Sequence, residues 1–269
     1  MSREKFEADF KSASEKSNEE IRKNLAGGYQ EEATKENAER DQLKTEIPAD
    51  ISAVEEKKKR IAEIEGKPES AIASKRERTA AEKEAIAGWE KFLKDCFPEE
   101  QFDLSALEVP ERTPEEERKF TRLQFRSGSL SDETLFQKCK ELFAAWKDTD
   151  ESLDDVAVKK AVRDSFIWVR DNEEADEKHK NKSANMIDEE GLRTESLGDR
   201  FLHELKYFKE TGKHLDNKTV TITSSRGADG CALLVHWFDD GMEVRRYDPG
   251  TRLDYWRPRQ VVSSAEGGK

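Results

Sequence analysis

The chain has 269 residues, of which 34% are hydrophobic and 40% are charged, and its formal net charge is -12. This composition excludes a single large core for the whole chain, because too little apolar surface is available to cover it. Most of the acidic excess lies between residues 96 and 196 and would repel duplex nucleic acid.

Cysteine usage and hydropathy indicate a cytoplasmic protein. Cys96, Cys139 and Cys231 are far apart and form no C-x-x-C pair, so we expect reduced thiols rather than disulfides or a zinc site. The N-terminus has no apolar stretch typical of a signal peptide, and no segment approaches the roughly 18 uncharged apolar residues that a spanning helix needs. We therefore expect no membrane association.

The first 96 residues are predicted to be charged helix of two kinds. Residues 1–45 contain few large apolar side chains, so we expect partly disordered or conditional helix. Residues 46–96 carry two apolar stripes, which are Ile47, Ile51, Val54, Ile61 and Ile64, and then Ile86, Trp89, Leu93 and Cys96. These stripes predict a helical hairpin or coiled coil through which the protein self-associates.

Residues 97–114 hold three prolines and no sustained period, which predicts a linker before a globular unit at 115–269. Thr113 and Pro114 predict the start of a short helix. Apolar residues at helical spacing predict three further helices. The four apolar faces are Phe120, Leu123 and Phe125; Leu135, Phe136, Cys139, Leu142, Phe143 and Trp146; Val158, Ala161, Val162, Phe166 and Val169; and, within 196–211, Leu197, Phe201, Leu202, Leu205 and Phe208.

The C-terminal part has a different texture. Alternating β-branched and aromatic residues predict strands at 219–223, 231–238 and 242–247, separated by turns at 227–230 and 239–241. We therefore predict an α+β fold that is mostly helical, with an N-terminal helical or coiled-coil hairpin, a three- to four-helix unit and a small C-terminal antiparallel β-sheet. Such a sheet is stable when helices cover it.

Short motifs within residues 135–263 permit comparison with a known family. They are Ile167-Trp168-Val169-Arg170-Asp171, Ser183-Ala184-Asn185, residues 210–216 (ETGKHLD), Ser225-Arg226, Asp229-Gly230, Trp237, Tyr247-Asp248-Pro249-Gly250 and residues 257–263 (RPRQVVS). In these motifs the chain resembles a bacterial protein family of candidate-phyla (Patescibacteria-type) genomes, for which no activity is established. Members often have Leu-Cys in place of Ile222-Thr223 and Val-Pro in place of Cys231-Ala232. The resemblance implies the architecture, and it implies no role for Cys231.

Arginine and aromatic residues alternate in the C-terminal module, which is typical of surfaces that bind acidic peptides or single-stranded nucleic acid. The candidate binding residues are Arg226, His236, Trp237, Arg245, Arg246, Tyr247, Arg252, Tyr255, Trp256, Arg257 and Arg259. A structural role is the alternative, because nearby aspartates can neutralise these arginines. We expect a non-enzymatic binding or adaptor protein whose partner is a protein or peptide, with single-stranded nucleic acid as the other ligand class.

The sequence contains none of the common phosphate-binding, metalloprotease or serine hydrolase motifs. The loop from Asp148 to Asp154 begins like a calcium loop, but Leu153 and Lys159 replace the required glycine and glutamate. We therefore expect no metal and no cofactor. The alternative function is an enzyme or binding protein acting on nucleic acid, with a pocket between the helical unit and the sheet near Arg226, His236 and Arg245. A cleft there with convergent polar groups and perturbed acids would favour the enzyme.

Overall fold

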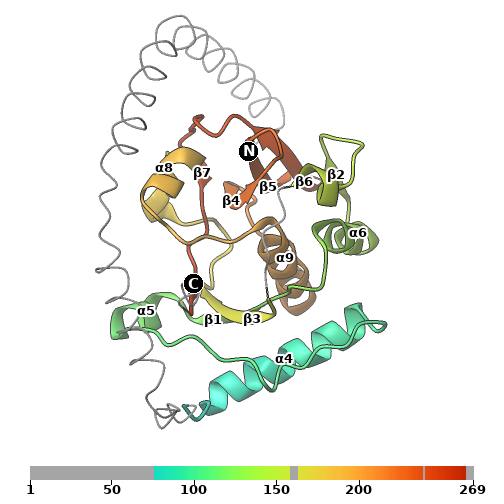
Figure 1. The fold of residues 1–269 in the computed structure, drawn as a ribbon, viewed down its shortest axis with the longest axis vertical. Coiled ribbons are helices and arrows are strands. Elements are labelled where there is room, and N and C mark those ends of the chain that lie inside the picture. The colour runs from blue at the N-terminus through green and yellow to red at the C-terminus, as the bar shows by residue number, and fades with distance from the viewer. Residues whose placement is uncertain (1–75, 158–162, 239, 265–269) are drawn as a thin grey trace, which may run out of the picture. The chain divides into compact units, whose positions relative to one another are not determined.

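The computed structural model describes residues 76–157, 163–238 and 240–264 (Figure 1). Its helices are α4 (Ala80–Cys96), α5 (Pro114–Lys119), α6 (Asp132–Leu142), α7 (Leu153–Val156), α8 (Ala184–Glu189) and α9 (Leu197–Thr211), with a short 3-10 helix, η1 (Glu177–His179). Its strands are β1 (Arg122–Arg126), β2 (Ala145–Lys147), β3 (Ser165–Val169), β4 (Val220–Arg226), β5 (Ala232–Phe238), β6 (Gly241–Tyr247), β7 (Trp256–Arg257) and β8 (Val262–Ser263). The segment predicted at 1–45 and the first helix of the predicted hairpin lie outside the described residues.

The prediction of a mostly helical fold is wrong. Among the described residues, 34% are helical and 23% lie in strands, and the strands form one sheet of three and one of five. β1 and β3 occupy positions where helices were predicted, because α5 ends at Lys119 and the run from Phe166 to Val169 is a strand. This run is buried at every position and consists of aromatic and β-branched residues, which favour a strand enclosed on both faces.

The three-stranded sheet has the order β1-β3-β8, and both pairs are antiparallel. α4 packs on β1 with the apolar face that its sequence predicts, and Trp89 Nε1 donates a hydrogen bond to the Leu123 carbonyl at 2.9 Å. Residues 97–113, which belong to the linker predicted at 97–114, also cover this core. Leu104 is 1% exposed, and the Pro110 carbonyl accepts a hydrogen bond from Trp168 Nε1.

The five-stranded sheet has the order β2-β6-β5-β4-β7. β4, β5 and β6 are the three predicted strands, and they pair antiparallel. The sheet is not purely antiparallel, however, since the short edge strands β2 and β7 run parallel to β6 and β4. Trp146, predicted as a helical residue, lies in β2, because the extended backbone at Phe143 ends α6.

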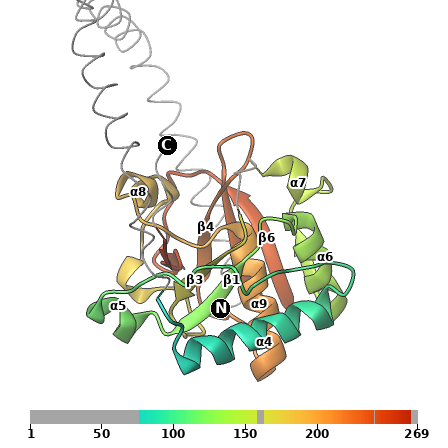
Figure 2. The ribbon, with the colours of Figure 1, turned by 60° about the horizontal axis from the view of Figure 1, so that its bottom comes forward.

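α9 is the central helix, because it contacts β1 of one sheet and β4 and β5 of the other (Figure 2). Its predicted bounds are confirmed: Ser196 forms the N-terminal capping box with Asp199, and Gly212 ends the helix with a left-handed backbone (φ 70°). Its polar side is enclosed as well as its apolar side. Asp199, Arg200 and Glu204 are at most 2% exposed, so this helix brings charged side chains into the interior.

Candidate functional site

The eleven predicted binding residues do not form one surface. His236, Tyr247, Trp256 and Arg259 are buried. The five-stranded sheet also separates members of the set, since Trp237 packs against the main core on the α9 side, whereas Tyr247 and Trp256 belong to a second core that includes residues of α8. The predicted surface is thus divided between the two faces of the sheet.

The half-buried arginines of this set each face an acidic side chain. The pairs are Arg226 with Asp188 (2.7 Å), Arg245 with Glu243 (2.6 Å), Arg246 with Asp148 (3.7 Å) and Arg257 with Glu177. Arg252 is exposed, and Trp237 and Tyr255 are half-buried. These pairings leave little positive charge for an anionic ligand.

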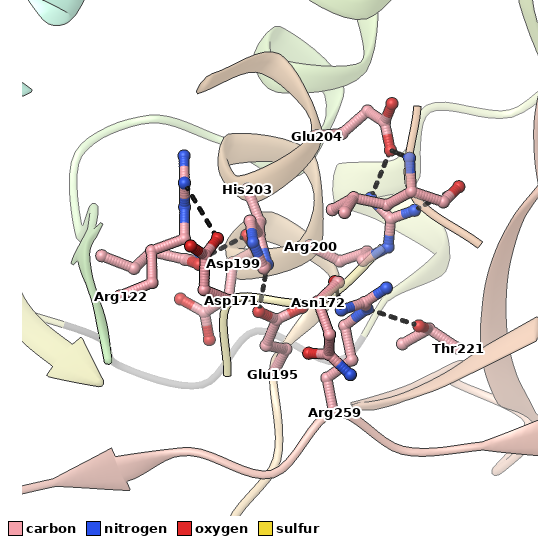
Figure 3. Close-up of polar contacts among 12 residues, drawn as sticks. Arg122, Asp171, Asn172, Glu195, Asp199, Arg200, His203, Glu204, Thr221 and Arg259 are labelled. Carbon is pink, nitrogen blue, oxygen red and sulfur yellow. Dashed lines mark hydrogen bonds and ion pairs between the residues drawn. The ribbon is translucent and has the colours of Figure 1, made fainter. Parts of the chain in front are cut away.

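Arg259 instead belongs to a buried polar network around Asp216 and α9, and Figure 3 shows its side chain beside that of Thr221. Asp216 accepts hydrogen bonds from Arg200 Nε (2.9 Å), Arg259 Nη2 (2.7 Å) and Thr221 Oγ1 (2.6 Å). Burial opposes ionisation, but the two guanidinium groups hold the pKa of Asp216 at about 2. Arg200 also donates to Glu204 at 2.8 Å. The network therefore keeps its charges paired inside the fold.

Glu195 and His203 form a second pair within this region, and Figure 3 shows their side chains pointing toward each other. His203 Nδ1 lies 2.8 Å from Glu195 Oε1. Burial raises the pKa of Glu195 to about 8 and lowers the pKa of His203 well below its usual value. The second oxygen of Glu195 and Nε2 of His203 have no hydrogen-bond partner among the described residues. Both side chains are closed to solvent, so this pair is a feature of the core rather than a ligand site.

The best candidate site is a cavity of about 300 Å³ at the N-terminal ends of α6 and α9, beside α7 and the end of β4. Its polar lining consists of six serines and three aspartates, which are Ser127, Ser129, Ser131, Ser196, Ser224, Ser225, Asp132, Asp154 and Asp199. We call it the serine cavity. It is not the pocket that the alternative function required, because neither Arg226, His236 nor Arg245 lines it.

Local hydrogen bonds explain the shape of the serine cavity. Ser131 and Ser196 cap α6 and α9, and Ser225 Oγ accepts from the Leu197 amide at 3.0 Å. α6 and α7 cap each other, because Asp154 Oδ1 accepts from the Glu133 amide and Glu133 Oε2 accepts from the Leu153 amide. Five of the nine polar lining side chains are therefore held by the ends of helices.

Asp132 differs from the other acidic residues of the cavity. Burial raises its pKa to about 7, and the negative charges of Asp154 and Asp199 add to this effect. Asp199 is held ionised, since Arg126 donates to both of its oxygens at 2.7 to 3.1 Å and lowers its pKa despite burial. The Asp132 carboxyl group has no hydrogen-bond or ion-pair partner among the described residues. One cavity thus contains two carboxyl groups whose environments move their pKa values in opposite directions.

Gly198 makes room for Asp132 at the first turn of α9. A Cβ atom at Gly198 would lie 2.8 Å from Asp132 Oδ1, which is closer than real contacts allow. The absence of a side chain at this position therefore lets the Asp132 carboxyl group lie against the end of the helix.

Sequence reasoning missed this site. Ser131 and Asp132 are recognisable as helix-capping residues, and Asp154 ends the calcium-like spacing, but nothing in the sequence brings them beside Ser196 and Ser224. Among the described residues, no group of three or more histidine, cysteine or acidic side chains is arranged to hold a metal ion.

Comparisons of the chain with protein-family models, with curated proteins and with solved structures found no match. None of the helices in the described ranges combines the length and the apolar character needed to cross a bilayer.

Proposed function

We propose that this protein binds a small polar molecule in the serine cavity. The observation that carries the proposal is Asp132, whose carboxyl group faces the cavity with no partner among the described residues and has a pKa raised to about 7. A carboxyl group in a cavity whose pKa is strongly shifted by burial is a candidate for a binding or catalytic role. The cavity volume is at the lower end of the range typical of small-molecule sites.

The charge of the lining restricts the ligand. Three aspartates line the cavity, and no lysine or arginine is among the described residues that line it. Phosphates and carboxylates would bring only further acceptor oxygens, whereas ligands rich in hydrogen-bond donors would satisfy the acceptor oxygens of the lining. This favours neutral or cationic molecules over nucleic acid as the ligand.

A ligand screen tests this proposal. Ligand-observed NMR with a library of small hydroxyl and amine compounds is expected to find binders that Asp132→Asn weakens at least about tenfold, the loss of one charge-assisted hydrogen bond. Glu141→Gln, which removes an exposed carboxylate from the same helix, is the matched control and is expected to bind normally. Binding that is equal in all three proteins would contradict the proposal.

A second candidate function is adaptor binding through Trp237. Four half-buried rings, those of Phe143, Phe208, His214 and Trp237, gather at one end of α9. His214 stacks on Trp237 with ring centroids 3.4 Å apart and on Phe208 at 4.6 Å. Partly exposed aromatic groups of this kind are typical anchors for a protein or peptide partner.

Site-specific photo-crosslinking tests the adaptor function. A photoreactive amino acid at position 237 is expected to capture one defined protein, and the same group at the exposed position 117 is expected to capture none. Equal capture at both positions would contradict it.

We also propose a cellular location, a family and a mode of self-association. A reducing, cytoplasmic location is supported by three free cysteines, two of them buried. Membership of the candidate-phyla bacterial family rests on the motifs quoted above. Self-association through residues 46–96 would have to use residues before α4 or release α4, because the apolar face of α4 is buried in the main core.

A further inference from the structure

We infer that the ligand of the serine cavity carries a primary ammonium group, and that Asp132 releases its proton to solvent when this group enters. The inference rests on the proposed function and names the ligand class of the same site.

The three aspartates of the cavity differ in how many of their oxygens already accept hydrogen bonds. Asp199 is occupied by Arg126 and by the amide of Ser196, and one oxygen of Asp154 accepts from the Glu133 amide. Asp132 offers both of its oxygens, since neither has a partner among the described residues. An ammonium group donates three hydrogen bonds and accepts none, so it matches a cavity in which carboxylate and hydroxyl oxygens predominate.

Charged residues of α7, α9 and β1 surround Asp132. Asp154 of α7 and Asp199 of α9 are negative, and Arg126 at the end of β1 is bound to Asp199. The loop at residues 127–131 contributes serines and Gly128, whose amide donates to Asp164. Burial, and then these two negative charges, raise the pKa of Asp132 to about 7, so about half of the molecules keep its proton at neutral pH. An entering cation would reverse this balance.

Proton release gives the inference a measurable signature. The pKa of Asp132 is about 7, so below that pH the ligand must displace a bound proton. Affinity is expected to fall by up to about tenfold for each pH unit below this value and to become constant above it. A neutral hydroxyl ligand does not favour the ionised carboxylate in this way, so its affinity should change little with pH.

Matched probes test the inference with the full-length protein. Butylamine and 1,4-diaminobutane are compared with butanol and 1,4-butanediol by titration calorimetry at about pH 6 and about pH 8, in two buffers of different ionisation enthalpy. The amines are expected to bind up to about tenfold more tightly at about pH 8 than at about pH 6, and to release a proton at the lower pH, as shown by the dependence of the heat on the buffer. Asp132→Asn should remove both effects, and Glu141→Gln should keep them.

Gly198→Ala provides a second variant in case Asp132→Asn fails to fold. The added methyl group would displace the Asp132 carboxyl group, so amine binding should weaken while the fold, checked by circular dichroism, is kept. Equal binding of amines and alcohols, or amine binding that does not change with pH, would overturn the inference and leave the small-molecule function intact. Failure of both probe sets and of the wider screen would overturn both.

Discussion

Glu195 and His203 show how burial sets the charge of a residue. Both are acid–base groups, yet neither carries a charge at neutral pH, because the pKa of Glu195 is about 8 and the pKa of His203 lies well below its usual value. Glu195 also joins the network to the serine cavity. It precedes Ser196, and its carbonyl accepts from the Ser224 amide at 2.8 Å.

The first prediction concerns the pH dependence of stability. The pKa of Glu195 rises from 4.5 to about 8 on folding, so between these values the folded state keeps a proton that the unfolded state loses. Stability from this group is therefore present below pH 4.5 and is lost as pH rises toward 8, by up to about 1.4 kcal/mol per pH unit. Glu195→Gln, which stays neutral, should lose less stability between about pH 5 and pH 8 in urea denaturation than the unmodified chain. Parallel profiles for the two proteins would show that Glu195 is ionised in the fold.

The second prediction concerns Asp216. Asp216→Asn keeps a residue that tolerates the left-handed backbone (φ 59°), but it leaves Arg200 and Arg259 without their shared counter-charge. We expect a loss of about 3 to 5 kcal/mol in the free energy of unfolding, measured by chemical denaturation. Asp171→Asn, which breaks a 3.4 Å contact at an exposed carboxylate, should cost less than about 1 kcal/mol. Similar small losses in both variants would mean that the buried ion pairs contribute little.

Single elements differ in how well the sequence predicts them. α9 and the strands β4, β5 and β6 carry their own local signals, a capping serine and terminal glycine in the helix and alternation in the strands. β1 and β3 do not, because their apolar residues also fit a helical spacing and their pairing partners are distant in sequence. A strand whose pairing decides its identity is therefore hard to recognise from its own residues.

The candidate site was less predictable than the fold. The arginines of the C-terminal module form a clear sequence pattern, yet the structure pairs or buries most of them. Asp132 and Ser196 attract attention only as helix caps, and their shared cavity depends on how α6 and α9 pack. Local sequence can indicate which residues end a helix, but not which helix ends meet.

The third prediction compares two helix glycines. Gly212 ends α9 with a left-handed backbone, so Gly212→Ala should lower the free energy of unfolding by about 1 to 2 kcal/mol. Gly88 lies inside α4, where a Cβ would meet only Lys206 Nζ at 3.6 Å, so Gly88→Ala should raise stability by up to about 1 kcal/mol. Thermal or urea denaturation distinguishes the two signs. A stabilising effect of Gly212→Ala would contradict the assigned end of the helix.

At the scale of the whole molecule, α4 connects the residues before it to the described fold. Trp89 is 2% exposed, contacts Phe92 and Phe125, and donates to the Leu123 carbonyl. The helix is thus part of the main core. A protein reduced to residues 115–269 would lose α4. It would also lose residues 97–113, which cover the same core.

The fourth prediction measures the contribution of α4. Trp89→Ala should destabilise the fold by about 3 to 5 kcal/mol, because it leaves a large void between α4 and β1. Trp89→Phe keeps an aromatic ring and loses the hydrogen bond to Leu123, so it should cost only about 1 to 2 kcal/mol. Both values follow from urea denaturation monitored by circular dichroism. If the alanine variant were as stable as the unmodified chain, α4 would not be part of the cooperative unit.

Arg78 lies just before α4, and its guanidinium group donates to the carbonyls of Leu104 (3.1 Å), Ser105 (2.9 Å) and Leu107 (2.5 Å). Trypsin must draw an arginine side chain into its own specificity pocket before it cleaves the next peptide bond. In the folded protein this side chain is already engaged, so the bond after Arg78 should survive limited digestion, and mass spectrometry of the resistant fragments should find Arg78 still joined to Thr79.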